Sequence, residues 1–248
     1  MGIAKRSPPR RKHVFPRERL YACLDHWNEC PVTWISGPAG SGKTTLVDAW
    51  LRNRSRRALW YPVEAKDRDP GSLFHHLGLT LRSIPEELPR FAPEYLGNVG
   101  EFARHFFPVY LPKLARYDAL VLDDLHEALE SEAFLAAAVQ ACSLLPESLK
   151  LILISRCGPN EAFHELLGSG RMCRVDWPQL RVTREETGQI VDWAATRLGL
   201  ASDLPVAQLH ANCDGFVAAI LLMLQTPGTR RRPRNGRWRR MPIRSPAI

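Results

Sequence analysis

The sequence predicts an α/β fold, in which a parallel five-stranded sheet lies between helices and a small helical subdomain follows. Five short, nearly continuous apolar runs occur between residues 32 and 176, and such runs are typical of strands buried on both faces. Amphipathic helical patterns separate these runs, and that alternation predicts helices on both sides of the sheet. Between Trp177 and residue 225 only helical patterns remain.

Each element follows from its local pattern. Asp69-Pro70 is a helix cap followed by proline at the first helical position, so a helix should begin there. Residues 100–114 are predicted to be helical but interrupted, because Pro108 and Pro112 lack the N–H of an intrahelical hydrogen bond. The predicted strands are residues 32–36 (VTWIS), 58–63 (ALWYPV), 119–123 (ALVLD), 149–155 (LKLILIS) and 172–176 (MCRVD).

Four regions are predicted along the chain. Residues 16–178 form the strand–helix domain, and residues 179–225 form a helical lid or arm that opens with a capping box. The basic start (1–15) and the Arg/Pro-rich tail (226–248) lack hydrophobic periodicity and are predicted to be disordered.

The net charge of +8 belongs to the two ends. Residues 230–248 contain eight Arg and no acidic residue, so the charge does not indicate a nucleic-acid-binding face on the folded body. No apolar run reaches the roughly 18 residues of a membrane-spanning helix, and the basic start has no apolar signal-peptide core. We therefore expect a cytoplasmic protein.

The stretch GPAGSGKT, from Gly37 to Thr44, matches the G-x-x-x-x-G-K-[ST] phosphate-binding loop. Glycines allow backbone N–H groups to turn toward phosphate oxygens. Lys43 would supply a positive charge to the β- and γ-phosphates, and the Thr44 hydroxyl can bind Mg²⁺. Because a strand precedes and a helix follows, we predict a P-loop NTPase that binds ATP or ADP. We assign nucleotide binding to Gly37, Pro38, Ala39, Gly40, Ser41, Gly42, Lys43, Thr44 and Thr45.

Two acidic residues end the third apolar run, where the carboxyl edge of a parallel sheet should face the phosphates. We assign Asp123, together with Thr44, to Mg²⁺, through water because magnesium retains several waters. Asp124 is the candidate that orients the attacking water. The alternative for Asp124 is a cap on the following helix.

The fourth run ends at Ser155-Arg156. A cation at that edge of the sheet could contact the γ-phosphate and report its presence, whereas the alternative is an ordinary surface salt bridge. We group Arg156 with Lys43 and Asp124 as the candidate catalytic residues.

The segments GPAGSGKTTLVDAWL, DRDPGSLFHHL, LVLDDLH, LILISR and LRVTREE, in this order, resemble the ATPase module of MalT-like, LuxR-type transcriptional regulators of the STAND class. The resemblance spans about residues 15–225 and includes DGFVAAILLML, with Phe216 where that family has Trp. It implies a slow, Mg-dependent ATPase that acts as a switch and self-associates in the ATP state. It also implies that Arg156 senses the γ-phosphate and that Arg17 contacts the base.

The chain departs from that family at some points. Leu125 replaces a usual Tyr, and we expect the following His126 to pack or hydrogen-bond locally. The family's sensor and helix-turn-helix do not follow residue 225, so we expect a truncated or frameshifted member without direct DNA binding.

Two other functions are considered. One is a stand-alone nucleotide-binding protein whose basic tail binds nucleic acid or an acidic partner in a salt-dependent way. The least favoured is an ATPase that works on nucleic acid, since no basic stripe interleaves the core motifs.

Overall fold

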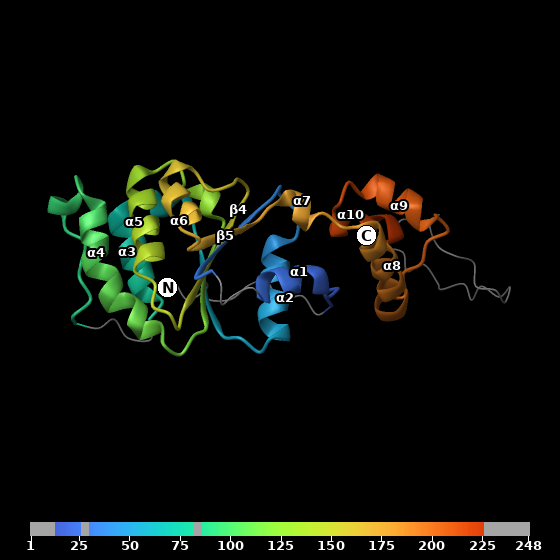
Figure 1. Ribbon diagram of the computed structural model, residues 1–248, viewed down its shortest axis with the longest axis horizontal. Coiled ribbons are helices and arrows are strands. Elements are labelled where there is room, and N and C mark those ends of the chain that lie inside the picture. Colours follow the sequence, from blue (N-terminus) through green and yellow to red (C-terminus); the bar gives the residue numbers. More distant parts are fainter. Residues whose placement is uncertain (1–12, 26–29, 82–85, 226–248) are drawn as a thin grey trace, which may run out of the picture. The chain divides into compact units, whose positions relative to one another are not determined.

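The computed structural model describes residues 13–25, 30–81 and 86–225 (Figure 1). Most of the predicted disordered start and the whole Arg/Pro-rich tail lie outside these residues. The chain separates into two compact units, Met1–Arg181 and Val182–Ile248. Within the described residues, no helix combines the length and apolar character that crossing a bilayer requires.

The first unit is built on a parallel sheet of five strands in the order β2-β3-β4-β1-β5. The predicted α/β fold with a five-stranded parallel sheet is therefore confirmed. Strand β1 lies between β4 and β5, with Ser36 opposite Ser155 and Ile35 opposite Val175. The strands are β1 (Val32–Ser36), β2 (Ala58–Pro62), β3 (Ala119–Asp123), β4 (Lys150–Ser155) and β5 (Met172–Val175).

Helices cover both faces of this sheet (Figure 1). One face packs against α3 to α6 through side chains such as Leu122 and Leu153, and the other packs against α1 and α2 through Val121 and Ile154. Burial on both faces explains why the strands read as continuous apolar runs. The helices of this unit are α1 (Glu18–Asp25), α2 (Lys43–Asn53), α3 (Pro70–Leu79), α4 (Val99–Tyr110), α5 (Glu132–Ser143), α6 (His164–Gly168) and α7 (Trp177–Leu180). Short 3₁₀ helices are η2 (Ala65–Arg68), η3 (Pro93–Tyr95), η4 (Leu111–Leu114), η5 (Leu125–Glu127) and η6 (Glu161–Phe163).

Two predicted helix features have different outcomes. Asp69 caps α3 as expected, since its carboxylate accepts a hydrogen bond from the Ser72 N–H at 2.7 Å. The predicted interruption at Pro108 is wrong, because α4 continues through it to Tyr110. Pro108 lies on the exposed side of the last turn, where burial of the opposite aromatic face outweighs the loss of one hydrogen bond. The helix changes to 3₁₀ geometry only next to Pro112.

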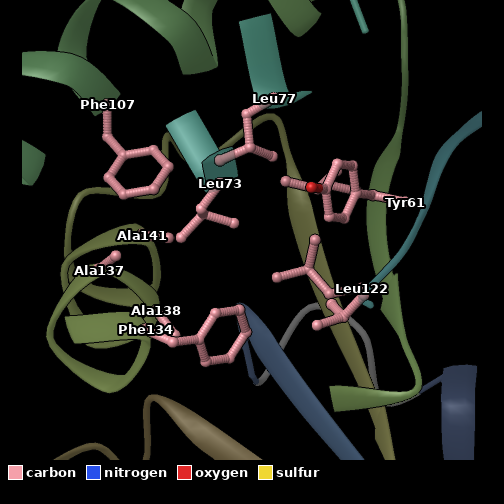
Figure 2. Close-up of a pocket in the computed structure, with 11 residues that line it drawn as sticks. Tyr61, Leu73, Leu77, Phe107, Leu122, Phe134, Ala137, Ala138 and Ala141 are labelled. Atoms are coloured by element: carbon pink, nitrogen blue, oxygen red, sulfur yellow. The ribbon is translucent and has the colours of Figure 1, made fainter. Parts of the chain in front are cut away.

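A small cavity lies between the sheet and α3, α4 and α5 (Figure 2). Its volume is about 20 Å³ and its walls are apolar, so it is a dry packing defect and too small for a ligand. It is lined by Tyr61, Val63, Leu73, Leu77, Phe107, Leu120, Leu122, Phe134, Ala137, Ala138 and Ala141.

The second unit consists of α8 (Arg184–Leu198), α9 (Val206–Cys213) and α10 (Val217–Gln225). The predicted capping box is present, because Thr183 and Glu186 exchange side-chain hydrogen bonds with each other's backbone N–H at 3.1 and 3.0 Å. Each helix contributes buried side chains to a common apolar core: Ile190, Ala194, Leu209, Cys213, Ile220 and Leu224.

Candidate nucleotide-binding site

The glycine loop joins the carboxyl end of β1 to the start of α2. Gly40 and Gly42 have φ angles of +77° and +86°, a left-handed conformation that glycine adopts without a steric cost. Apart from the adjoining residues, no heavy atom of the described chain lies within 4 Å of the place where a Cβ would stand on either glycine. In the described structure no side chain caps the N-terminus of α2 at Gly42. The first N–H groups of this helix are therefore available to an anion.

Lys43 lies across this loop. Its ammonium donates hydrogen bonds to the carbonyl oxygens of Gly37 at 2.6 Å and Pro38 at 3.0 Å, and to the Ser41 hydroxyl at 3.2 Å. Burial lowers the pKa of Lys43. The carboxylates of Asp123 and Asp124 raise this pKa, and the Arg156 guanidinium lowers it. The structure thus brings the charged candidates from three separate segments within electrostatic range of one another.

Thr44 and Asp123 are in direct contact. The Thr44 hydroxyl donates to the two carboxylate oxygens of Asp123 at 3.0 and 3.3 Å. Asp123 is 5% exposed, and its carboxylate also accepts hydrogen bonds from the Asp124 N–H at 3.0 Å and from Nε1 of Trp60 at 3.3 Å. Burial raises the pKa of Asp123, and the neighbouring Asp124 carboxylate raises it further. The hydrogen bonds that Asp123 accepts lower this pKa and oppose both effects. A cation beside this carboxylate would compensate the cost of burying its charge.

Asp124 has a backbone conformation that non-glycine residues seldom adopt. Its φ is +58°, in the left-handed region that Asp and Asn tolerate best. The alternative role as a helix cap has no support in the described structure, because its side chain makes no capping hydrogen bond to η5. The carboxylate is instead 59% exposed, at the edge of the sheet next to Asp123.

Arg156 follows the last residue of β4 and is exposed. Within the described part of the chain, no hydrogen bond or ion pair holds its guanidinium. The loop that carries Arg156 is bonded to the core, because Nε1 of the buried Trp34 donates a hydrogen bond to the Cys157 carbonyl at 3.0 Å. The salt-bridge alternative for Arg156 is therefore not observed.

Leu125 and His126 lie beside the two aspartates. Leu125 is fully buried, so an apolar side chain takes part in the core at this position. Both ring nitrogens of His126 are buried and make no hydrogen bond to any described residue. Nδ1 lies 3.9 Å from an Asp124 carboxylate oxygen, and Nε2 lies 3.3 Å from a Glu127 carboxylate oxygen. Of the two expected local roles of His126, packing or hydrogen bonding, the described residues show packing.

Arg17 lies against the end of α7. It is buried, and its guanidinium donates to the carbonyl oxygens of Leu180 at 2.6 Å and Arg181 at 3.1 Å. Arginine side chains of this kind satisfy carbonyls at a helix end. Arg17 therefore fastens the residue before α1 to the end of α7, and its contact with a base remains a prediction.

The structure adds three residues that motif reasoning did not identify: Trp34, Trp60 and Asp176. Trp60 supports the Asp123 carboxylate, Trp34 supports the loop of Arg156, and Asp176 accepts a 2.6 Å hydrogen bond from Ser36 at the start of the glycine loop. Each contact joins neighbouring strands, so the strand order would have been the signal that identifies them.

These residues fit a nucleoside triphosphate with its magnesium ion. The open helix end and the positive-φ glycines suit phosphate oxygens, and Thr44 and Asp123 provide the hydroxyl and carboxylate oxygens that Mg²⁺ prefers. Among the described residues, no group of three His, Cys, Asp or Glu side chains could hold a metal without additional ligands. A site completed by phosphate and water is consistent with this arrangement.

Comparison with known proteins identifies the chain's relatives. The HTH-type transcriptional regulator MalT of Cronobacter sakazakii (strain ATCC BAA-894) is 26% identical over 225 residues, and MalT of Serratia proteamaculans (strain 568) is 29% identical over 198 residues. These matches cover 87% and 75% of this chain. The chain is a distant homologue of MalT. It spans 24% and 21% of the two regulators' own lengths. No protein-family model matches it.

The MalT-related chain also has a recognisable fold among solved structures. The Walker-type ATPase PABY2304 of Pyrococcus abyssi superposes with a TM-score of 0.53 and 13% sequence identity, over 89% of this chain and 69% of that one. The similarity confirms a P-loop ATPase fold.

Proposed function

We propose that this chain is an ATP-binding, slowly hydrolysing switch module, acting in the cytoplasm as part of the MalT type of regulation. The observation that carries the proposal is the contact between Thr44 and Asp123, beside Lys43 and a helix N-terminus that no described side chain caps. A bound phosphate with its cation would make use of all these features together. The relation to MalT, which is an HTH-type transcriptional regulator, favours switching over rapid turnover.

Each residue has a role in this proposal. Lys43 would exchange its hydrogen bonds to the loop carbonyls for phosphate oxygens. Thr44 and Asp123 would hold Mg²⁺, which would neutralise phosphate charge. Asp124 orients the attacking water, and Arg156 contacts the γ-phosphate, so that its guanidinium distinguishes ATP from ADP.

The central test is nucleotide binding by Lys43→Ala. We expect no measurable ATP binding in equilibrium dialysis with Mg²⁺, because the phosphates lose their main positive charge. Lys113→Ala is the matched control, since Lys113 is exposed and distant in sequence from the loop, and it should bind ATP like the unmodified chain. Equal ATP binding by Lys43→Ala and the control would refute the proposal.

A second measurement addresses the switch. A latched switch should retain nucleotide through purification, so we expect roughly stoichiometric ADP to be released when the protein is denatured. Nucleotide-free protein that hydrolyses ATP with rapid product release would contradict the switch and favour an ordinary ATPase.

A further inference from the structure

The strand order gives a bound nucleotide a direction, if the proposed function is correct. The groups assigned to the γ-phosphate and the metal end or follow β3 and β4, which lie on one side of β1: Asp123, Asp124 and Arg156. A nucleotide whose phosphates point to that side must extend its base to the other side along the carboxyl edge. The strand on that side is β5, and α7 follows it directly.

Helix α7 is held tightly against the start of the glycine loop. The Ser36 hydroxyl donates to the Asp176 carboxylate at 2.6 Å. A Cβ built on Gly37 would lie 3.1 Å from Cδ1 of Leu180 and 3.5 Å from Cε3 of Trp177. These distances mean that glycine at position 37 allows the two side chains to pack against the loop backbone.

The other end of α7 is fixed by two arginines. Arg17 donates to the Leu180 carbonyl at 2.6 Å, and Arg19 donates to the Gln179 carbonyl at 2.8 Å. Helix α7, although only four residues long, is therefore held in place next to the loop by hydrogen bonds and packing at both of its ends.

Trp177, the first residue of α7, contributes an aromatic ring next to the loop. It is half-buried, and the exposed Arg181 guanidinium lies 6.0 Å from the ring centroid. A planar cation over the ring indicates that one face of the indole is within reach of a flat group. We propose that Trp177 is the platform on which the base of the bound nucleotide stacks, which favours purine over pyrimidine nucleotides because a purine covers more of the indole. Arg17 then contributes to base binding by holding α7 in place.

The experiment compares a ligand that has a base with one that lacks it. Titration calorimetry with Mg²⁺ measures the affinities of ATP and inorganic triphosphate for the unmodified chain, Trp177→Leu and Trp177→Phe. We expect Trp177→Leu to bind ATP about tenfold more weakly, as loss of one base–aromatic stack implies, and inorganic triphosphate as before. Trp177→Phe keeps a flat ring and should retain most of the ATP affinity.

Two outcomes would overturn this proposal: unchanged ATP affinity in Trp177→Leu, or equal weakening of ATP and inorganic triphosphate, which indicates support of the loop and not of the base. Should Trp177→Leu fail to fold, as judged by its thermal unfolding, the unmodified chain still provides a test. It must bind ATP more tightly than CTP and inorganic triphosphate, and equal affinities would reject the platform. Failure of the proposed function differs, because the unmodified chain would then bind none of these ligands.

Discussion

The hydroxyl of Thr44 lies 3.0 Å from a carboxylate oxygen of Asp123, although 79 positions separate the two residues in the sequence. One residue belongs to the first turn of α2 and the other ends β3, which is not a direct neighbour of β1. The carboxyl edge of a parallel sheet brings such residues together because all strands end there. This pair is the basis for the first prediction.

Replacing Thr44 by Val should weaken ATP binding about tenfold when Mg²⁺ is present, because a hydrogen-bonding oxygen near the cation is lost at constant side-chain shape. In magnesium-free buffer the variant and the unmodified chain should bind ATP equally. Thr44→Ser keeps the hydroxyl and is the control. Equal weakening with and without Mg²⁺ would indicate that Thr44 supports the loop and does not bind the cation.

Replacing Asp124 by Asn should preserve ATP binding and slow hydrolysis by about 100-fold, the effect of losing a residue that orients or activates the attacking water. Asn is chosen because it tolerates the left-handed backbone at this position. Single-turnover release of phosphate measures the effect. Glu127→Gln, a charge loss three residues away, should hydrolyse ATP at the unmodified rate, and an active Asp124→Asn would remove Asp124 from the candidate catalytic residues.

Replacing Arg156 by Ala should reduce the affinity for ATP and leave the affinity for ADP unchanged, because only ATP carries the phosphate that the guanidinium contacts. A charged hydrogen bond predicts a change of about tenfold. Competition binding of the two nucleotides measures the ratio. Arg104→Ala, at an exposed position of α4, serves as the control. A parallel loss of ATP and ADP affinity would argue against γ-phosphate sensing.

Two cysteines should differ in reactivity. Cys142 is fully buried, and this burial raises the pKa of its thiol to about 12, whereas Cys157 is exposed. Because only the thiolate reacts, a maleimide at pH 8 should modify Cys157 and leave Cys142 unmodified, as peptide mass spectrometry would detect. Labelling of Cys142 in the folded protein at this pH would contradict its burial.

The same thiol makes a prediction about stability. An unfolded cysteine releases its proton above about pH 8.5, while the folded Cys142 retains it up to about pH 12. The unfolded state therefore binds fewer protons in this window, and the contribution of Cys142 to the free energy of unfolding should fall as pH rises. Cys142→Ala should show a smaller decrease over the same range.

Leucines of α3 should differ in their contribution to stability. Leu73 lines the small cavity (Figure 2) and is 4% exposed. Leu79 of the same helix is 42% exposed. Leu73→Ala should cost about 2–5 kcal/mol of unfolding free energy, because it removes buried methyl groups and enlarges an existing void. Leu79→Ala should cost much less. Urea unfolding of both variants tests this, and similar losses would contradict the packing of α3.

Much of the fold follows from local pattern. The strands were predictable because both faces of each strand are buried, which requires apolar residues at successive positions. Asp69 and Thr183 mark helix starts because their side chains satisfy backbone N–H groups of the next turn, an interaction within four residues. The continuation of α4 through Pro108 could not be predicted, because the aromatic face of this helix is stabilised by partners distant in sequence, such as Phe74. Helix α7 is too short to produce a hydrophobic period.

The sequence by itself determined the chemistry of the glycine loop, since Lys43, Thr44 and the left-handed glycines are needed within one short segment. It could not determine which side chains meet that loop. Tertiary structure decided that Asp123 receives the Thr44 hydroxyl, that Trp34 and Trp60 support the neighbouring loops, and that Arg17 bonds to carbonyls 163 and 164 positions away. Strand order results from the packing of whole faces against helices, and this cooperative property is not encoded in any single stretch of residues.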